Sequence, residues 1–220
     1  MKDSITNFVL LRHGEAQMGV DKHRAEMAKP RPLRCSNVRN DKSPLTETGK
    51  RQTITVAKAL KKKFGKFDVV FVSPYLRTRQ TAALIKRYIP CSKIIVDKRI
   101  RERSKGKLEL LTRYGVRVRF PGEYKRMLKD GTYRYRPPGG ENFSDVKNRI
   151  DNFMRDARLN RNVLVITHGA DIACIMDYLE YFSIAKLLQV NFDVRLSSVT
   201  CYSRGKKGGL KRRFYNKIYY

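Results

Sequence analysis

Two histidines in this chain have closely similar surroundings. His13 lies in the tripeptide Arg12-His13-Gly14, which follows the apolar run FVLL. His168 follows the run VLVIT and also precedes a glycine, although the chain has only three histidines. A buried strand that ends in histidine presents the imidazole at the carboxyl edge of a sheet, where open α/β sheets bind their ligands. Because Arg12 carries a planar cationic fork that suits phosphate, the pattern predicts phosphate chemistry at that edge.

Four further segments complete this pattern. In chain order they are Pro44–Gly49 (PLTETG), Ser73–Ala82 (SPYLRTRQTA), Ile100–Arg103 (IRER) and Tyr135–Asn142 (YRPPGGEN). Together with the two histidines they resemble the histidine phosphatase superfamily, also called phosphoglycerate mutase-like, and the last segment resembles its bacterial phosphatase branch. The matches run in family order from Phe8 to about Thr200. They are specific for the superfamily but not for a substrate.

The resemblance implies a role for each matching residue. His13 would be the nucleophile, with Arg12, Arg77 and His168 around the oxygens of the transferred phosphate, and Glu102 would be the general acid and base. A neutral imidazole can attack phosphorus, and a neighbouring arginine helps to keep it neutral. Since cationic side chains stabilise the developing charge, we expect neither a metal nor another cofactor.

Other charged residues compete for some of these roles. Glu15, Asp21 and Glu141 are rivals of Glu102 as the acid, although Glu141 could instead cap a helix. Glu15, Arg101 and Arg103 are candidate substrate-binding residues, with a solvated run of charge as the alternative reading for the two arginines.

The surroundings of Glu102 contain a conflict. A general acid must hold its proton, yet Arg101 and Arg103 on either side would lower the pKa of Glu102. A bound phosphate dianion would raise that pKa again, so we expect a mildly acidic optimum of activity.

The composition indicates one globular domain. The chain has 220 residues, of which 41% are hydrophobic, enough for a sizeable core. No stretch is long enough to span a membrane, and residues 1–4 lack an apolar signal segment, so we expect a cytoplasmic protein without a membrane partner. The four cysteines are scattered without the spacing of a metal site, which predicts reduced thiols.

The net charge is unusual. Lysine and arginine total 49 against 20 acidic residues, which gives +29 spread along the whole chain. Such an excess attracts polyanions, so a polyanionic substrate or a nucleic acid is a candidate partner. A solvated basic surface with no particular partner explains the charge as well.

Apolar runs alternate with helical patterns, which predicts an α/β fold: a three-layer α/β/α sandwich with a mainly parallel central sheet. Strands are expected at Phe8–Arg12, Val69–Ser73, Ile94–Asp97, Val163–His168 and Ser198–Tyr202, with an edge strand at Phe214–Tyr219 after a turn at Gly205–Gly209. Helices are expected at Thr48–Phe64, Tyr75–Tyr88, Glu141–Arg158 and Ala170–Tyr181. Thr46 is the expected cap of the first helix.

Two segments stand apart within the single domain of residues 1–220. Residues 18–42 are basic and contain two prolines, which predicts a loop after the first strand. Residues 105–138 are basic and aromatic, and we expect them to form helical turns that cover the site as a lid. The aromatic side chains of this lid would form either a small core of their own or a stacking surface for a base or sugar.

These observations favour a phosphomonoesterase that hydrolyses a small phosphorylated metabolite through a phosphohistidine. A cofactor-dependent mutase is the alternative within enzymes, although the span from Glu102 to His168 is shorter than mutases usually have. A protein that uses the same fold to attach to RNA or a ribonucleoprotein is the alternative outside enzymes. The sequence settles neither the substrate nor the oligomeric state.

Overall fold

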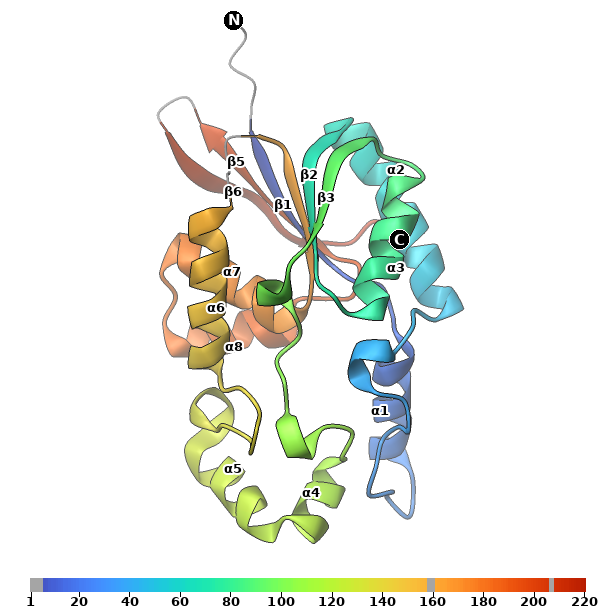
Figure 1. The fold of residues 1–220 in the computed structure, drawn as a ribbon, viewed down its shortest axis with the longest axis vertical. Coiled ribbons are helices and arrows are strands. Elements are labelled where there is room, and N and C mark those ends of the chain that lie inside the picture. The colour runs from blue at the N-terminus through green and yellow to red at the C-terminus, as the bar shows by residue number, and fades with distance from the viewer. Residues whose placement is uncertain (1–5, 158–160, 206–207) are drawn as a thin grey trace, which may run out of the picture.

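The computed structural model describes residues 6–157, 161–205 and 208–220. Six strands form one sheet: β1 (Asn7–Arg12), β2 (Phe67–Val72), β3 (Cys91–Val96), β4 (Val163–Thr167), β5 (Val199–Gly205) and β6 (Gly208–Lys217). Their order is β3-β2-β4-β1-β5-β6, with β1 to β4 parallel and β5 and β6 antiparallel at one side (Figure 1). The expected mainly parallel α/β sheet is confirmed.

Helices cover both faces of this sheet. The long ones are α2 (Glu47–Phe64), α3 (Leu76–Lys86), α6 (Phe143–Asp156), α7 (Gly169–Glu180) and α8 (Ile184–Asp193). Alternation along β1 explains the two layers, since successive side chains of a strand point to opposite faces. Phe8 and Leu10 pack under α6, α7 and α8, whereas Val9 and Leu11 pack under α2 and α3.

The first long helix begins where the sequence predicts. The hydroxyl of Thr46 accepts a hydrogen bond from the backbone N–H of Gly49 at 3.0 Å, which caps α2. The predicted end of α6 at Arg158 and part of the predicted Gly205–Gly209 turn lie outside the described residues. In the part that the structure describes, α6 ends at Asp156 and β6 begins at Gly208, earlier than the predicted edge strand.

The sequence predicted a loop for the basic segment 18–42, but the structure shows helical pieces there. It begins in α1 (Gln17–Met27) and ends in a short 3-10 helix, η1 (Asn40–Lys42). Only Ala25 of α1 is buried, so the helix lacks the apolar stripe by which a surface helix is recognised. The helix α8 was also missed from the sequence.

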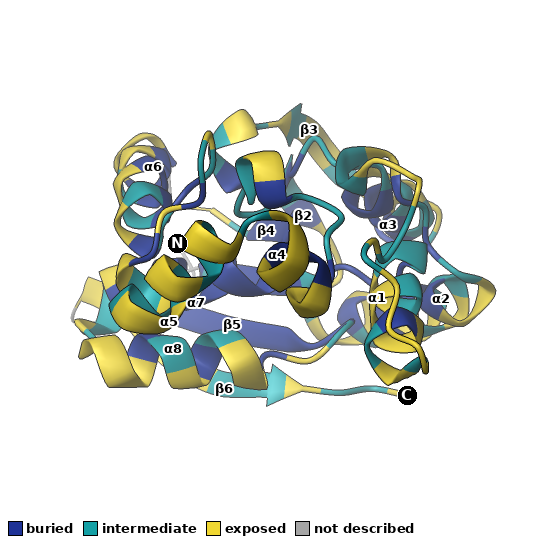
Figure 2. Cartoon of the chain, turned by 90° about the horizontal axis from the view of Figure 1, so that it is seen from below, coloured by how far each residue is buried: buried dark blue, intermediate teal, exposed yellow. Residues whose placement is uncertain are grey.

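The segment 105–138 forms three helical pieces at the carboxyl end of the sheet, as expected. They are η3 (Gly106–Leu108), α4 (Arg113–Arg119) and α5 (Pro121–Arg134). Leu108, Val116 and Tyr135 form a small core of their own, against which Phe120 and Tyr124 pack. This finding supports the first reading of the aromatic side chains. Figure 2, which views the molecule from this end, shows α4 and α5 in front of the buried strands.

The segments 18–42 and 105–138 contact each other. The backbone of Leu33 accepts a hydrogen bond from the N–H of Thr112, and the N–H of Cys35 donates to the carbonyl of Leu110. Gly115 lies against the Leu33 carbonyl so closely that a Cβ there would lie 1.9 Å from the oxygen. The chain around Leu33 and Cys35 therefore packs directly against the start of α4. In the described residues, no helix is long and apolar enough to cross a membrane.

Glycines fasten the end of β1 to the start of α2. A Cβ on Gly14 would lie 2.4 Å from the carbonyl oxygen of Gly49, and a Cβ on Gly49 would lie 2.0 Å from the carbonyl oxygen of Glu15. The absence of a side chain at Gly14 thus lets the end of β1 lie close to α2. This close approach fixes the position of His13, the residue before Gly14.

Replacement of Gly49 by alanine should destabilise the protein by roughly 1–3 kcal/mol, because backbone atoms fill the space that the methyl group needs. The midpoint of urea unfolding measures this loss. Gly19→Ala is the matched control, since no atom lies within 4 Å of a Cβ at this helical position. The control should leave stability unchanged or raise it by up to ~1 kcal/mol. Equal midpoints for the two variants would contradict the packing argument.

Candidate active site

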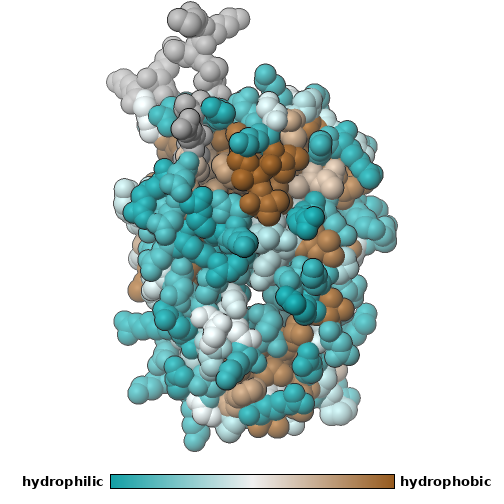
Figure 3. Space-filling view, in the orientation of Figure 1, coloured by the Kyte–Doolittle hydropathy of each residue, from teal (hydrophilic) through white to brown (hydrophobic). Residues whose placement is uncertain are grey.

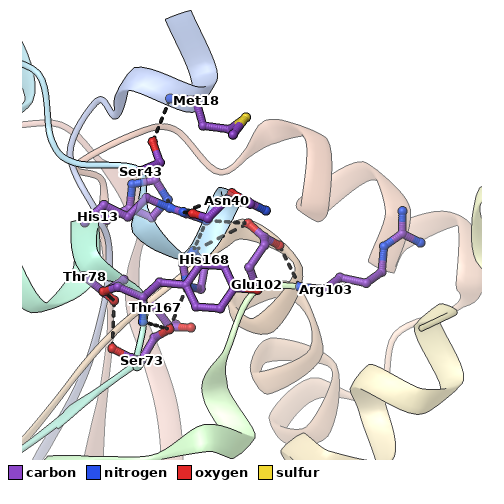
Figure 4. Close-up of polar contacts among 12 residues, drawn as sticks. His13, Met18, Asn40, Ser43, Ser73, Thr78, Glu102, Arg103, Thr167 and His168 are labelled. Atoms are coloured by element: carbon purple, nitrogen blue, oxygen red, sulfur yellow. Dashed lines mark hydrogen bonds and ion pairs between the residues drawn. The ribbon is translucent and has the colours of Figure 1, made fainter. Parts of the chain in front are cut away.

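The two histidines that share a sequence pattern meet in the structure. His13 follows β1 and His168 follows β4, and these strands are parallel neighbours with Arg12 opposite Thr167. The centroids of the two imidazole rings lie 5.0 Å apart, and both residues are buried. Figure 4 shows both histidines in one cluster of polar side chains at this edge of the sheet.

Arg77 connects these two rings. It lies in the first turn of α3, after β2, and is only 3% exposed. Its Nε donates to His13 Nε2 at 3.0 Å, and one terminal nitrogen contacts His168 Nδ1 at 3.3 Å. The other terminal nitrogen donates to the carbonyl oxygen and the side-chain oxygen of Asn40, at 2.7 and 3.1 Å. The guanidinium therefore fixes three segments of the chain around one point.

The contacts of His13 determine which ring nitrogen carries the proton. Its Nδ1 lies 2.7 Å from the carbonyl oxygen of Gly14, which can only accept, so Nδ1 must donate. Its Nε2 faces the N–H of Arg77, which can only donate, so Nε2 must hold a lone pair. Burial and the charges of Arg77 and Arg12 hold the pKa of His13 well below its usual range. His13 is therefore a neutral imidazole with its lone pair at Nε2.

His168 is neutral for the same reasons. Burial, Arg77 and then His13 and Arg12 lower its pKa well below the usual value. Its Nε2 lies 2.8 Å from the hydroxyl oxygen of Ser73, while Nδ1 faces Arg77 and must accept there. Its Nδ1 also lies 3.5 Å from Oε2 of Glu102. A phosphate dianion near these groups would raise the pKa of His168 and favour its protonation.

One terminal nitrogen of the Arg12 guanidinium is hydrogen-bonded, whereas its Nε–H has no partner among the described residues. One terminal nitrogen donates to the carbonyl oxygen of Val194 at 2.5 Å. Its Nε is buried and has no partner within the described part of the chain. Burial lowers the pKa of Arg12, and Glu102 partly offsets this effect. A partly buried cation with a spare N–H suits an anionic ligand, since charge-assisted hydrogen bonds are the strong ones.

Glu102 is the carboxylate that faces this cluster. Its Oε2 lies 3.7 Å from Arg77 and 3.5 Å from His168, and its Oε1 accepts from the backbone N–H of Arg103 at 3.0 Å. The side chain is 26% exposed, so the carboxylate can reach both the cluster and solvent.

The three rivals of Glu102 are engaged elsewhere. Glu141 forms ion pairs with Arg101 at 2.6 Å and with Arg149 at 3.0 Å. Glu15 accepts from the Thr46 hydroxyl at 2.6 Å, at the start of α2. Asp21 accepts from Gln17 within α1.

The structure thus separates the predicted site residues into two groups. It brings together five of them: Arg12, His13, Arg77, Glu102 and His168. Glu15 and Arg101 contact structural partners instead, and Arg103 extends away from the histidines in Figure 4. Among the described residues, no group of three or more histidine, cysteine, aspartate or glutamate side chains could hold a metal ion.

Sequence reasoning missed three contributors to the site. Asn40 reaches Arg77 from η1, and no motif pointed to it. Ser73 belongs to the quoted SPYLRTRQTA segment, but its contact with His168 depends on the neighbouring positions of β2 and β4. The ring of Tyr75 lies 5.1 Å from that of His168, with the Arg77 guanidinium over its face at 4.8 Å.

Comparison with known proteins agrees with this geometry. The family model of the histidine phosphatase superfamily (branch 1) matches residues 8–216. The chain belongs to the histidine phosphatase superfamily. The relatives of this superfamily member include a 2,3-bisphosphoglycerate-dependent phosphoglycerate mutase of Bartonella bacilliformis, 26% identical over 80% of this chain and 82% of the mutase. A fructose-2,6-bisphosphatase of Saccharomyces cerevisiae is 29% identical over 77% of the chain, but the match spans only 33% of that protein.

A solved structure shares the fold of this superfamily member. The alpha-ribazole phosphatase of Shigella flexneri superposes with a TM-score of 0.72 and 21% identity, over 96% of this chain and 98% of that one. The expected phosphoglycerate mutase-like architecture is therefore confirmed.

The charge of Arg77 should add to the effect of burial in lowering the pKa of both histidines. Arg77→Met removes the cation that lowers their pKa values, so both values should rise. Titration of the imidazole signals by NMR measures this directly, since the chain has only three histidines. Arg77→Lys should keep both pKa values low, because it retains a cation. Arg79→Met, on the exposed side of α3, is the control, and a rise of the same size there would contradict the assignment.

Proposed function

We propose that this protein is a phosphomonoesterase that hydrolyses a small phosphorylated substrate through a phosphohistidine on His13, without a metal. The observation that carries the proposal is the lone pair at Nε2 of His13. The Gly14 carbonyl and the Arg77 guanidinium both impose this tautomer, and the depressed pKa keeps the ring unprotonated. The same lone pair accepts from Arg77 in the unliganded site, and it becomes available to phosphorus when phosphate takes over that donor.

The proposed reaction has two steps. In the first, Nε2 of His13 forms a bond to phosphorus while the ester P–O bond breaks, and Glu102 gives a proton to the leaving alcohol oxygen. In the second, Glu102 takes a proton from water, the water oxygen attacks phosphorus, and the N–P bond breaks to release phosphate. Arg12, Arg77 and His168 hold the equatorial oxygens as charge spreads over them. The incoming phosphate must compete with His13 for the Arg77 Nε–H.

Two features favour hydrolysis. Glu102 is partly exposed and therefore accessible to the attacking water. Relatives and structural neighbours include proteins named as phosphatases, which supports the same reaction class here.

A mutase is the second candidate, because the Bartonella relative carries that name and matches most of the chain. A mutase returns the phosphate of the phosphohistidine to a bound product instead of to water. An assay for isomerisation of 3-phosphoglycerate with a bisphosphate primer separates the two candidates: isomerisation faster than release of inorganic phosphate would favour the mutase.

His13→Asn should abolish turnover, because asparagine has no nucleophilic lone pair at the position of Nε2. Wild-type protein exposed briefly to a labelled phosphomonoester and quenched in alkali should carry acid-labile phosphate on His13. His23→Asn, on the exposed side of α1, should retain both activity and label. Assays in excess chelator test at the same time whether a divalent metal is needed. Label on serine or aspartate would refute the mechanism.

Glu102→Gln should affect substrates according to their leaving group. Alkyl phosphates need a proton on the leaving oxygen, so their kcat should fall by roughly 10²–10⁴-fold. p-Nitrophenyl phosphate expels p-nitrophenolate, which is stable as an anion, so the rate of its bond-breaking step should fall far less. A single-turnover measurement isolates that step from hydrolysis of the phosphohistidine. Equal losses for both substrates would point to a positioning role for Glu102.

A further inference from the structure

A cavity of about 600 Å³ lies beside the proposed active site. Residues of α1 line one side of it, and residues of η3, α4 and α5 line the other. This volume is typical of pockets that bind small molecules. In the half of the molecule that contains these helices, Figure 3 shows brown apolar side chains among teal polar ones.

The cavity adjoins the segment that carries Glu102. Arg103 and Lys105, which line it, follow Glu102 by one and three residues. Glu102 faces the histidines, whereas Arg103 points away from them toward the lid helices in Figure 4. Because Glu102 is proposed to protonate the leaving oxygen, the alcohol part of the substrate extends from that oxygen into this cavity.

The part of the cavity nearest Glu102 is basic. In the described residues, the side-chain amines of Lys22 and Lys105 have no ion pair and no hydrogen bond. Arg103 is held over the Phe143 ring at 4.8 Å and donates to the carbonyl of Thr132 at 3.3 Å, but it has no carboxylate within ion-pair distance there.

The charges around Lys105 favour an anion. Burial and the charge of Lys22 lower the pKa of Lys105, Arg103 lowers it further, and Glu109 opposes them. The one carboxylate in the described lining, Glu26, accepts from the backbone N–H of Arg113. The cations at the Glu102 end therefore gain more from a negative ligand than from hydroxyl groups.

The rest of the cavity lining is mostly apolar, although Glu26, Arg113 and Thr132 also contribute to it. Leu108, Leu111 and Val116 contribute to one side of it, and Met127 and Leu128 of α5 contribute to another. Of these side chains, all except Leu128 belong to or pack against the small core of Leu108, Val116 and Tyr135, whereas Leu128 is exposed. An apolar group that enters this space gains by leaving water.

We propose that the substrate is a phosphomonoester whose alcohol part carries a second anionic group close to the ester and an apolar body beyond it. Lys105, Lys22 and Arg103 bind the second anionic group, and the apolar side chains of η3, α4 and α5 enclose the body. This inference rests on the proposed phosphatase function and specifies its substrate class. A plain sugar phosphate matches neither the cations nor the apolar surface.

Four synthetic alkyl phosphates test the two features separately. They are 2-phospholactate, 2-phosphooxy-4-phenylbutanoate and the methyl ester of each, so that the carboxylate and the phenyl body vary independently. In wild-type protein, kcat/KM should rise with the carboxylate and with the phenyl group, and should be highest for the phenyl acid.

Two variants should separate these gains. Lys105→Met should reduce the ratio of kcat/KM for acid over methyl ester by about tenfold, the usual consequence of losing a charge-assisted hydrogen bond. Met127→Gln should instead reduce the gain from the phenyl group. Lys107→Met is the control for charge, since Lys107 is exposed and does not line the cavity. Lys22→Met provides a second test at an exposed position of α1 if Lys105→Met fails to fold.

Equal kcat/KM for acids and esters in wild-type protein would overturn the anion site, as would equal effects of Lys105→Met and Lys107→Met. A gain from the carboxylate alone would overturn the apolar half of the proposal. Failure of the proposed function is recognised separately, by the absence of turnover of p-nitrophenyl phosphate. In that case, calorimetric titration still measures the affinity of the protein for each of the four compounds. The affinities must then follow the order expected for kcat/KM, with the phenyl acid bound most tightly, for the proposal to stand.

Discussion

The buried guanidinium of Arg77 is the constraint on which the site depends. A buried cation is costly unless hydrogen bonds and counter-charge compensate for it. Here the compensation comes from two imidazole lone pairs, from Asn40, and from Glu102 at 3.7 Å. Because arginine can only donate, it determines the tautomer of each ring as well as its position. One side chain in the first turn of α3 thus orients both rings, and together with burial it keeps them neutral.

A second buried arginine positions the segment that carries Glu102. One terminal nitrogen of Arg149 donates to Asp171 and to the carbonyl of Arg99, both at 2.6 Å. Thr167, at the end of β4, lies 2.7 Å from the carbonyl of Ile100 and 2.8 Å from Asp171.

These contacts connect the segment that carries Glu102 to β4, the strand that presents His168. The Thr167 hydroxyl has one proton for two neighbouring oxygens. Burial raises the pKa of Asp171 to about 7, although Arg149 opposes this effect. A proton on Oδ2 of Asp171 could be donated to the Thr167 hydroxyl, which could then donate its own proton to the Ile100 carbonyl.

The sequence was informative where one strand or helix determines a position by itself. His13 and His168 could be placed because each follows a buried run of apolar residues, and Arg77 because it lies in a recognisable segment. Asn40 could not, since it reaches Arg77 only through the path of the chain between α1 and α2. Likewise α1 gave no signal because nearly all its residues are at least partly exposed, and tertiary contacts decide that Arg101 turns toward Glu141.

The location of positive charge distinguishes the reacting centre from the cavity beside it. At the centre, positive charge resides on arginines while both histidines are neutral, so the proposed nucleophile and the cations proposed to bind phosphate are different groups. The desolvation of Arg12 and Arg77 is a cost already met on folding, so phosphate meets cations that are already in place. The Nε–H of Arg77 must exchange its bond to His13 for one to phosphate. In the cavity, Lys22 and Lys105 have no ion pair and no side-chain hydrogen bond within the described residues. Because a lysine carries its charge on a long stem with several rotatable bonds, these two amines can adapt to a ligand. Fixed arginines at the proposed phosphate site and lysines at the proposed leaving-group site fit a reaction whose transferred group is constant, while the body of the substrate determines specificity.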